Sequence, residues 1–181
     1  ELDLENLEVN LRKFSKGYAV RSANQARRDG FLHSIFDWNS HLDEIHLINT
    51  SLPERNDRPM SAAYNRSPEQ LRVRGLAESS KCLIHWIKNF GVFSPDGELV
   101  AYLRLKRQGQ ILIYTTILGH GDYLSKGVMY LLHHETLRHL ARDQDCSDTL
   151  LVYSSFNSGS DGLKQWKRRG LFEEFSISQS S

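Results

Sequence analysis

A histidine between two glycines follows the most apolar stretch of the chain. The stretch covers residues 111–118, and Gly119, His120 and Gly121 come directly after it. An imidazole has an unperturbed pKa of about 6.5, so His120 can accept a proton from an attacking nucleophile near neutral pH. The competing interpretation is structural, in which His120 caps a turn formed by its glycine neighbours. We predict His120 as a catalytic base and keep both interpretations open.

A long polar loop supplies the second group of candidate residues. Residues 52–67 contain two prolines and several Asn, Asp and Arg side chains, and loops of this length in compact domains are often functional. Arg55 and Arg58 are close to Tyr64 in the sequence, and paired guanidinium groups can hold a carboxylate or a phosphate. We predict Arg55, Arg58 and Tyr64 as substrate-binding residues. A solvated loop with incidental charges is the alternative.

The histidines and cysteines do not form a metal-binding pattern. His133 and His134 are adjacent, so a helix turns them to different faces, and His139 completes no ligand spacing with them. His41 and His46 are five residues apart and cannot share a helix face as the i, i+4 pair of a zinc protease does. We therefore predict no metal site. Two cysteines are too few for a disulfide framework and indicate a reducing compartment, which we take to be the cytoplasm.

The middle of the chain predicts an antiparallel meander. Residues 83–93 are rich in β-branched and aromatic side chains, and the Ser-Pro-Asp-Gly sequence at 94–97 favours a tight turn into a strand at 99–105. A second turn at 108–110 leads into the apolar run 111–118. Because that run is apolar on both faces, we expect it in the centre of the sheet.

The other elements follow from capping residues and hydrophobic periodicity. We expect one or two strands at 4–20, a helix from Ser40 to about residue 49, a helix that begins at Ser67 and Pro68, a long helix at 122–142 with Asp122 as N-cap, a strand at 149–154, a helix from Ser160 to Arg169 and a last strand at 172–177. A strand, a glycine turn, a long helix and a strand in series require a right-handed crossover between parallel strands. The sheet should therefore be mixed.

Length and composition are those of one soluble domain. The chain has 181 residues, 39% of them hydrophobic, so we expect a single domain over 1–181 with a frayed tail at 175–181. Lys plus Arg number 23 and Asp plus Glu 22, and the net charge of +1 excludes a uniformly basic surface. Basic segments at 9–28 and 164–169 leave RNA as a partner that we do not favour, and no stretch is long enough to predict a membrane span.

Two segments resemble the GNAT acyltransferase superfamily. Residues 118–129 (LGHGDYLSKGVM) stand where that family has its pyrophosphate loop, and residues 165–173 (QWKRRGLFE) are similar to its closing helix and Gly-apolar turn. The resemblance covers roughly the last hundred residues. It implies an α/β domain with a mixed, mostly antiparallel central sheet flanked by helices. It also implies an enzyme that moves an acyl group directly from acyl-CoA, for example acetyl-CoA, to an amine.

The resemblance assigns roles to particular residues. The family's loop holds the pyrophosphate of coenzyme A through backbone N–H groups at a helix N-terminus. Carried over to this chain, the donor-binding residues are Leu118, Gly119, Gly121, Ser125, Lys126, Gly127 and Val128. Backbone N–H groups near Leu118 and Gly119 would polarise the acyl carbonyl. Arg55, Arg58 and Tyr64 would bind the acceptor, a small-molecule or peptide amine.

Three positions depart from the family pattern. Leu124 replaces a basic or Gln residue, Met129 replaces a second small residue, and Trp166 replaces the tyrosine that serves as general acid. Tyr123 is close to the loop, so we predict it as the replacement proton donor, with a tyrosine packed on the sheet as the alternative. Such departures are similar to FemAB-type and other aminoacyl-tRNA-dependent transferases, which is the second hypothesis. A catalytically silent binding module with the same fold is the third.

Overall fold

The computed structural model describes residues 4–55, 58–73, 82–146, 149–153 and 160–174. Its α-helices are α1 (Leu4–Lys13), α2 (Tyr18–Arg28), α3 (Leu42–Thr50), α4 (Pro68–Leu71), α5 (Val128–Arg142) and α6 (Asp161–Arg169). Its strands are β1 (Leu32–Ile35), β2 (Glu54–Arg55), β3 (Arg58–Pro59), β4 (His85–Phe93), β5 (Leu99–Gln108), β6 (Ile111–Gly119) and β7 (Leu150–Val152). Short 3₁₀ helices are η1 (Phe14–Gly17), η2 (Trp38–Ser40), η3 (Ala62–Tyr64), η5 (Gly121–Lys126) and η6 (Gln144–Cys146).

The main sheet has the strand order β1-β4-β5-β6-β7. Neighbouring strands are antiparallel from β1 to β6, and β7 lies parallel to β6. The α/β class, the mixed sheet and the meander β4-β5-β6 are therefore confirmed. The prediction that the third strand of the meander occupies the centre was wrong, because β5 does. β6 is apolar on both faces because helices α3 and α5 contact it from opposite sides.

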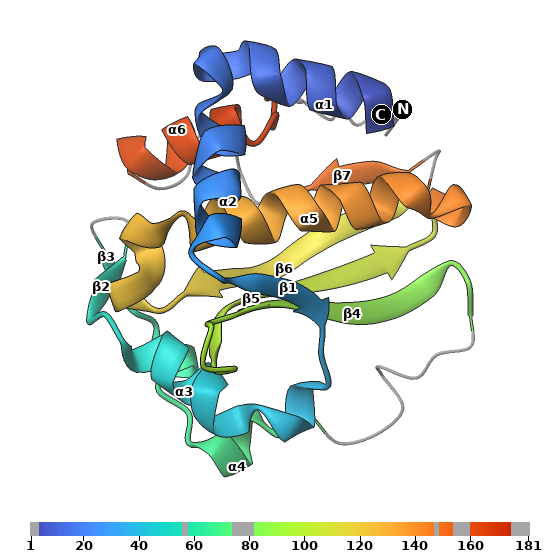
Figure 1. The fold of residues 1–181 in the computed structure, drawn as a ribbon. Coiled ribbons are helices and arrows are strands. Elements are labelled where there is room, and N and C mark those ends of the chain that lie inside the picture. Colours follow the sequence, from blue (N-terminus) through green and yellow to red (C-terminus); the bar gives the residue numbers. More distant parts are fainter. Residues whose placement is uncertain (1–3, 56–57, 74–81, 147–148, 154–159, 175–181) are drawn as a thin grey trace.

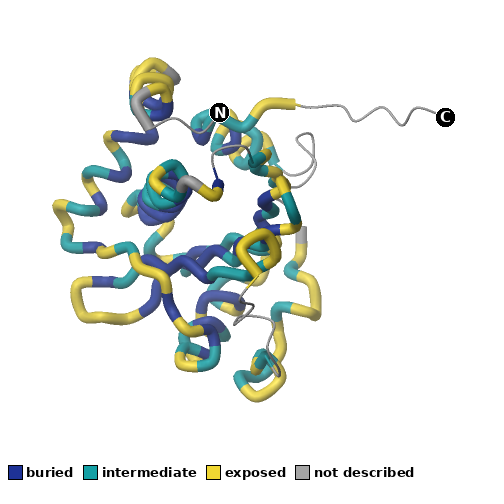
Figure 2. Tube along the Cα trace, turned by 90° about the vertical axis from the view of Figure 1, so that its right-hand side faces the viewer, coloured by how far each residue is buried: buried dark blue, intermediate teal, exposed yellow. Residues whose placement is uncertain are grey.

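Two helical layers cover the sheet (Figure 1). Leu131 and Leu132 of α5 pack with Leu103 of β5 in the larger core, on one face of the sheet. Ile45 and Ile48 of α3 pack with Tyr102 on the other face. Buried positions gather in the strands and the helix beside them, while the loops at the rim are exposed (Figure 2). None of the helices in the described part is long and apolar enough to cross a membrane.

The first twenty residues form helices, so the expected strands there were wrong. Leu7 and Leu11, four residues apart on α1, join Val20 of α2 and Leu137 of α5 in a small separate core. Gly17 adopts a left-handed conformation with φ of 70° and lets the chain turn from η1 into α2. The alternation of apolar residues resembled a strand, but contact with α5 selects the helical faces.

An ion-pair network reinforces this helical layer. Nε of Arg138 on α5 donates to the carboxylate of Glu8 on α1 at 2.6 Å, and the ring of His134 lies 3.3 Å from the same carboxylate. Arg27 of α2 donates to Glu135. The network thus joins α1 and α2 to α5.

Several predicted element ends shift. Ser67 forms a capping box for α4 and Ser160 caps α6, as expected. Ser40 lies in η2 instead, and Asp122 lies in η5, because α5 begins only at Val128. Residues 172–174 are not a strand, and the rest of the predicted last strand lies outside the described residues, as do the tail at 175–181 and the end of the strand predicted at 149–154.

Candidate active site

Strands β6 and β7 diverge soon after they begin. β6 pairs with β5 along its whole length, but the pairing with β7 covers only residues 111–113 of β6. One residue beyond the end of β6, the backbone N–H of His120 donates to the carbonyl of Val100 in β5 at 2.8 Å. Because main-chain groups alternate in direction along a strand, the N–H groups of Ile117 and Gly119 point away from β5. This edge of β6 therefore faces the gap that the divergence opens.

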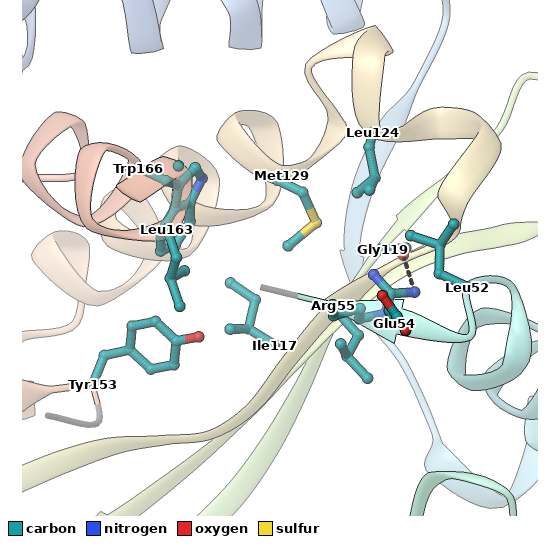
Figure 3. A pocket seen from close by; sticks show the side chains of 12 residues that line it. Leu52, Glu54, Arg55, Ile117, Gly119, Leu124, Met129, Tyr153, Leu163 and Trp166 are labelled. Carbon is teal, nitrogen blue, oxygen red and sulfur yellow. Dashed lines mark hydrogen bonds between the residues drawn. The ribbon is translucent and has the colours of Figure 1, made fainter. Parts of the chain in front are cut away.

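The gap is a cleft of about 340 Å³ (Figure 3). Its lining residues come from β2 and the loop before it, the end of β6, η5, the beginning of α5, the residue after β7 and the first two turns of α6. They are Leu52, Glu54, Arg55, Ile117, Leu118, Gly119, Leu124, Met129, Tyr153, Gly162, Leu163 and Trp166. Most of these side chains are apolar, and the charged ones are confined to one end. Such a cleft suits a largely apolar ligand with few polar groups.

Gly119 is a part of the cleft wall where a side chain has no room. A Cβ atom at this position would lie 2.6 Å from Sδ of Met129 and 3.0 Å from Cδ2 of Leu124. Both atoms are the ends of side chains that also line the cleft (Figure 3). Only glycine allows these two side chains to close directly over the strand.

Arg55 ties the charged end of the cleft together. One terminal nitrogen of its guanidinium donates to the carbonyls of Gly119 at 2.9 Å and Ile48 at 3.0 Å, and to the hydroxyl of Ser51 at 3.0 Å. Its Nε is buried and has no hydrogen-bond partner among the described residues. Glu54 lies beside Arg55 at the same end (Figure 3). This end therefore offers a positive and a negative group to a ligand.

Tyr153 occupies the opposite end of the cleft and directs its hydroxyl into it (Figure 3). Burial raises the pKa of Tyr153 to about 12, and nearby Tyr64 acts in the same direction, so the phenol keeps its proton. Nζ of Lys167, a buried residue, lies 5.1 Å from the centre of the Tyr153 ring. Burial lowers the pKa of Lys167. Trp166 borders the same cleft, and its buried indole N–H has no hydrogen-bond partner within the part of the chain that the structure describes.

The predicted catalytic pair lies outside the cleft lining. His120 accepts a hydrogen bond from the backbone N–H of Asp122 at 3.4 Å, and its ring centre is 5.7 Å from that of Tyr123. The Tyr123 ring packs edge-on against Phe31, with the ring centres 5.8 Å apart. These contacts are those of the structural alternatives, and the catalytic roles of His120 and Tyr123 stay predictions.

The predicted donor-binding residues are divided between two places. Leu118 and Gly119 line the cleft. Ser125, Lys126 and Gly127 line a separate hollow of about 230 Å³ against α2, together with Leu124, Tyr130 and α2-side residues Tyr18, Ser22, Gln25 and Asp29. Val128 is buried in the core, and the N–H of Gly121 donates to the hydroxyl of Ser51 at 3.0 Å.

Of the predicted acceptor-binding residues, Arg55 is in the cleft lining. Burial lowers the pKa of Arg55, and Tyr64 is near enough to act on that pKa in the opposite direction. Arg58 begins β3, and its side chain lies outside what the structure describes. Sequence reasoning missed Glu54, Tyr153, Leu163 and the cleft position of Trp166. Within the described ranges, no three His, Cys, Asp or Glu side chains are grouped as metal ligands.

No protein-family model matches the sequence, and no curated protein matches it as a relative. Among solved structures, the fold is similar to that of an acetyltransferase from Trypanosoma brucei, with a TM-score of 0.53 and 14% sequence identity. The match covers 84% of this chain and 99% of that one. At this identity the likeness shows the fold alone.

Proposed function

We propose that this domain, whose fold is GNAT-like, transfers an acyl group from a thioester donor to an amine acceptor. The observation that carries the proposal is the cleft between the diverging strands β6 and β7, with the open main-chain edge of β6 along it. An extended amide-containing chain can pair with such an edge as an added strand does. The pantetheine arm of an acyl-CoA such as acetyl-CoA has this chemistry.

The cleft fits an arm of that kind. Its volume of about 340 Å³ lies in the range of small-molecule sites, and its walls are mostly apolar. The inward N–H of Gly119 can donate to the acyl carbonyl oxygen, and that hydrogen bond strengthens as negative charge develops on the oxygen. The backbone thus supplies the electrostatic part of catalysis.

The acceptor enters best at the charged end of the cleft. Glu54 can take a proton from the amine there, while Arg55 keeps the loop fixed to Gly119 through its hydrogen bond to the carbonyl. The amine nitrogen attacks the acyl carbon, a C–N bond forms and the C–S bond breaks. The amine loses one proton to Glu54.

The thiolate that leaves needs a proton, and Tyr153 is the phenol that borders the cleft in the described structure. Its raised pKa keeps the hydroxyl protonated until the sulfur becomes negative. Lys167, whose Nζ lies 5.1 Å from the centre of the Tyr153 ring, can return the proton to the tyrosinate. Tyr153, directly after β7, would thereby serve as the general acid. The corresponding position in α6 is occupied by Trp166, which cannot donate a proton in this way.

The first test is donor binding and turnover. Acetyl-CoA at millimolar concentration should raise the melting temperature, and transfer to a panel of small amines and peptides should release free thiol. No shift and no thiol release with acetyl-CoA or longer acyl-CoAs would contradict the proposal.

Matched variants then identify the catalytic groups. We expect Tyr153→Phe to lower kcat by about 100-fold and Tyr123→Phe by less than about threefold, because only the first phenol borders the cleft. In the same way, Glu54→Gln should lower kcat by about 100-fold and His120→Ala by much less. The reverse order in either pair would assign the role to the residue predicted from the sequence.

A further inference from the structure

We infer that the donor is recognised by its acyl group and its pantetheine arm, and that the nucleotide of coenzyme A adds little to binding. The substrate class is therefore acyl thioesters of pantetheine-like thiols, whether or not a nucleotide is attached. This inference rests on the proposed function, because it concerns the same cleft.

Helix α2 lies directly on the loop that should hold the pyrophosphate. A Cβ atom on Gly127 would be 2.5 Å from the carbonyl oxygen of Ser22 on α2. The absence of a side chain at Gly127 therefore lets α2 pack directly on this loop, with the carbonyl oxygen of Ser22 in contact with it. A phosphate would be repelled by that oxygen, since both carry negative charge.

Leu124 separates this loop from the cleft. Its side chain borders the cleft on one side and the hollow beside α2 on the other. Together with Met129 it closes over Gly119. An anionic group that left the cleft toward the start of α5 would have to pass two apolar side chains that offer it no hydrogen bond.

The charges around the hollow do not favour an anion either. Among the described residues that line it, the cation Lys126 is offset by the carboxylate of Asp29. The guanidinium of Arg169 lies 4.0 Å from the centre of the Tyr18 ring and donates to the hydroxyl of Tyr130 at 3.2 Å. In the cleft itself, Arg55 is opposed by Glu54. The residues that line the hollow and the cleft therefore carry no net positive charge, and Arg169 beside the hollow is already in contact with Tyr18 and Tyr130.

The test compares donors that differ only in the nucleotide. Dissociation constants of acetyl-CoA and acetyl-pantetheine are measured by calorimetry on the full chain, with adenosine 3′,5′-bisphosphate as competitor. We expect the two constants to agree within about threefold, which is less than one ordinary hydrogen bond contributes, and we expect no competition by the bisphosphate.

Acetyl-pantetheine binding about 30-fold or more weaker than acetyl-CoA would overturn the inference and leave the proposed function standing. If neither thioester binds, the proposed function is wrong and the inference falls with it. The two failures are therefore distinguishable.

Two loop variants give an independent measurement. Lys126→Glu should change the affinity for acetyl-CoA by less than about twofold, whereas a loss of about tenfold confined to acetyl-CoA would overturn the inference. Leu124→Arg, at a position 39% exposed, should introduce the missing cation. It should tighten acetyl-CoA about tenfold relative to acetyl-pantetheine, and the ratio of the two dissociation constants corrects for any change in the cleft wall to which Leu124 also belongs. If Leu124→Arg changes the affinity for both donors equally, the added cation does not act on the nucleotide, and this result would contradict the inference.

Discussion

Gly119 and Gly127 are eight residues apart and belong to the same candidate loop, yet their surroundings differ. Gly119 lies directly against the movable ends of Met129 and Leu124 in the wall of a ligand-sized cleft. Gly127 has a φ of 78° and faces the rigid backbone of α2. The first glycine makes room beside a cleft and the second makes room for a helix crossing. A glycine in a loop of this kind therefore does not by itself indicate a phosphate site.

The largest effect is expected at Gly127. Gly127→Ala should destabilise the fold by about 3 kcal/mol or more, because the new Cβ meets the Ser22 carbonyl at 2.5 Å and φ is 78°. The measurement is chemical denaturation. Gly97→Ala is the control, since Gly97 has a φ of 86° and open space around it, and should cost about 1–2 kcal/mol. Equal losses for both variants would show that α2 does not press on the loop.

The next largest effect is expected for His133, which is buried in α5, the helix that begins after Gly127. Burial holds the pKa of His133 at about 4, although Gly170 accepts a hydrogen bond from the ring, whereas an unfolded chain has the ordinary value of 6.5. The unfolded state therefore binds a proton first as pH falls. Stability that is complete above pH 6.5 should decline by about 3 kcal/mol toward pH 4 from this residue.

Denaturation of wild type and His133→Gln across that pH range checks the prediction. The variant should be less stable at pH 7 and should show a shallower decline. His33, whose pKa burial also lowers to about 4, remains in both proteins and keeps part of the slope. An unchanged slope would mean that His133 takes up its proton without cost.

The smallest effect on stability is expected at Gly119. Gly119→Ala should cost about 1 kcal/mol, because the ends of Met129 and Leu124 can move where a backbone cannot. The displaced side chains must enter the cleft, so acetyl-CoA binding should weaken by about tenfold or more. A variant that binds the donor normally would move the site away from β6. A loss of stability as large as that of Gly127→Ala would remove the contrast between the two glycines.

The sequence predicted best those parts of the fold that depend on neighbouring residues. The turn at 94–97 and the strands beside it were identified because turn chemistry and strand pattern lie within one local segment. The helices α1 and α2 were missed because Leu7 and Leu11 become a helical face only when Leu137, more than a hundred residues later, covers it. The spacing of Leu4, Leu7 and Leu11 also fits a helix face, but only this long-range packing decides between that pattern and the alternation of a strand.

The same reason explains which of the predicted site residues the structure brings to the cleft. Leu118 and Gly119 were predicted from the resemblance of residues 118–129 to the family's loop, and they line the cleft, while their role in donor binding stays a prediction. Tyr153 and Glu54 are far apart in the sequence and border one cleft only because β6 and β7 diverge. Two features of the sequence could have pointed to Tyr153 as a site residue. They are the polar segment 143–148 before β7 and the aromatic residue directly after that strand.

The ion-pair network between the first helices and α5 also has a consequence for synthesis on the ribosome. Glu8 and Arg27 find their partners only when Arg138 and Glu135 have been made, more than a hundred residues later. Until then, the apolar faces of the nascent α1 and α2 lack the surface that buries them. The emerging chain should thus depend on chaperones until late in translation, and its amino-terminal segment should be among the last to become protected from proteases.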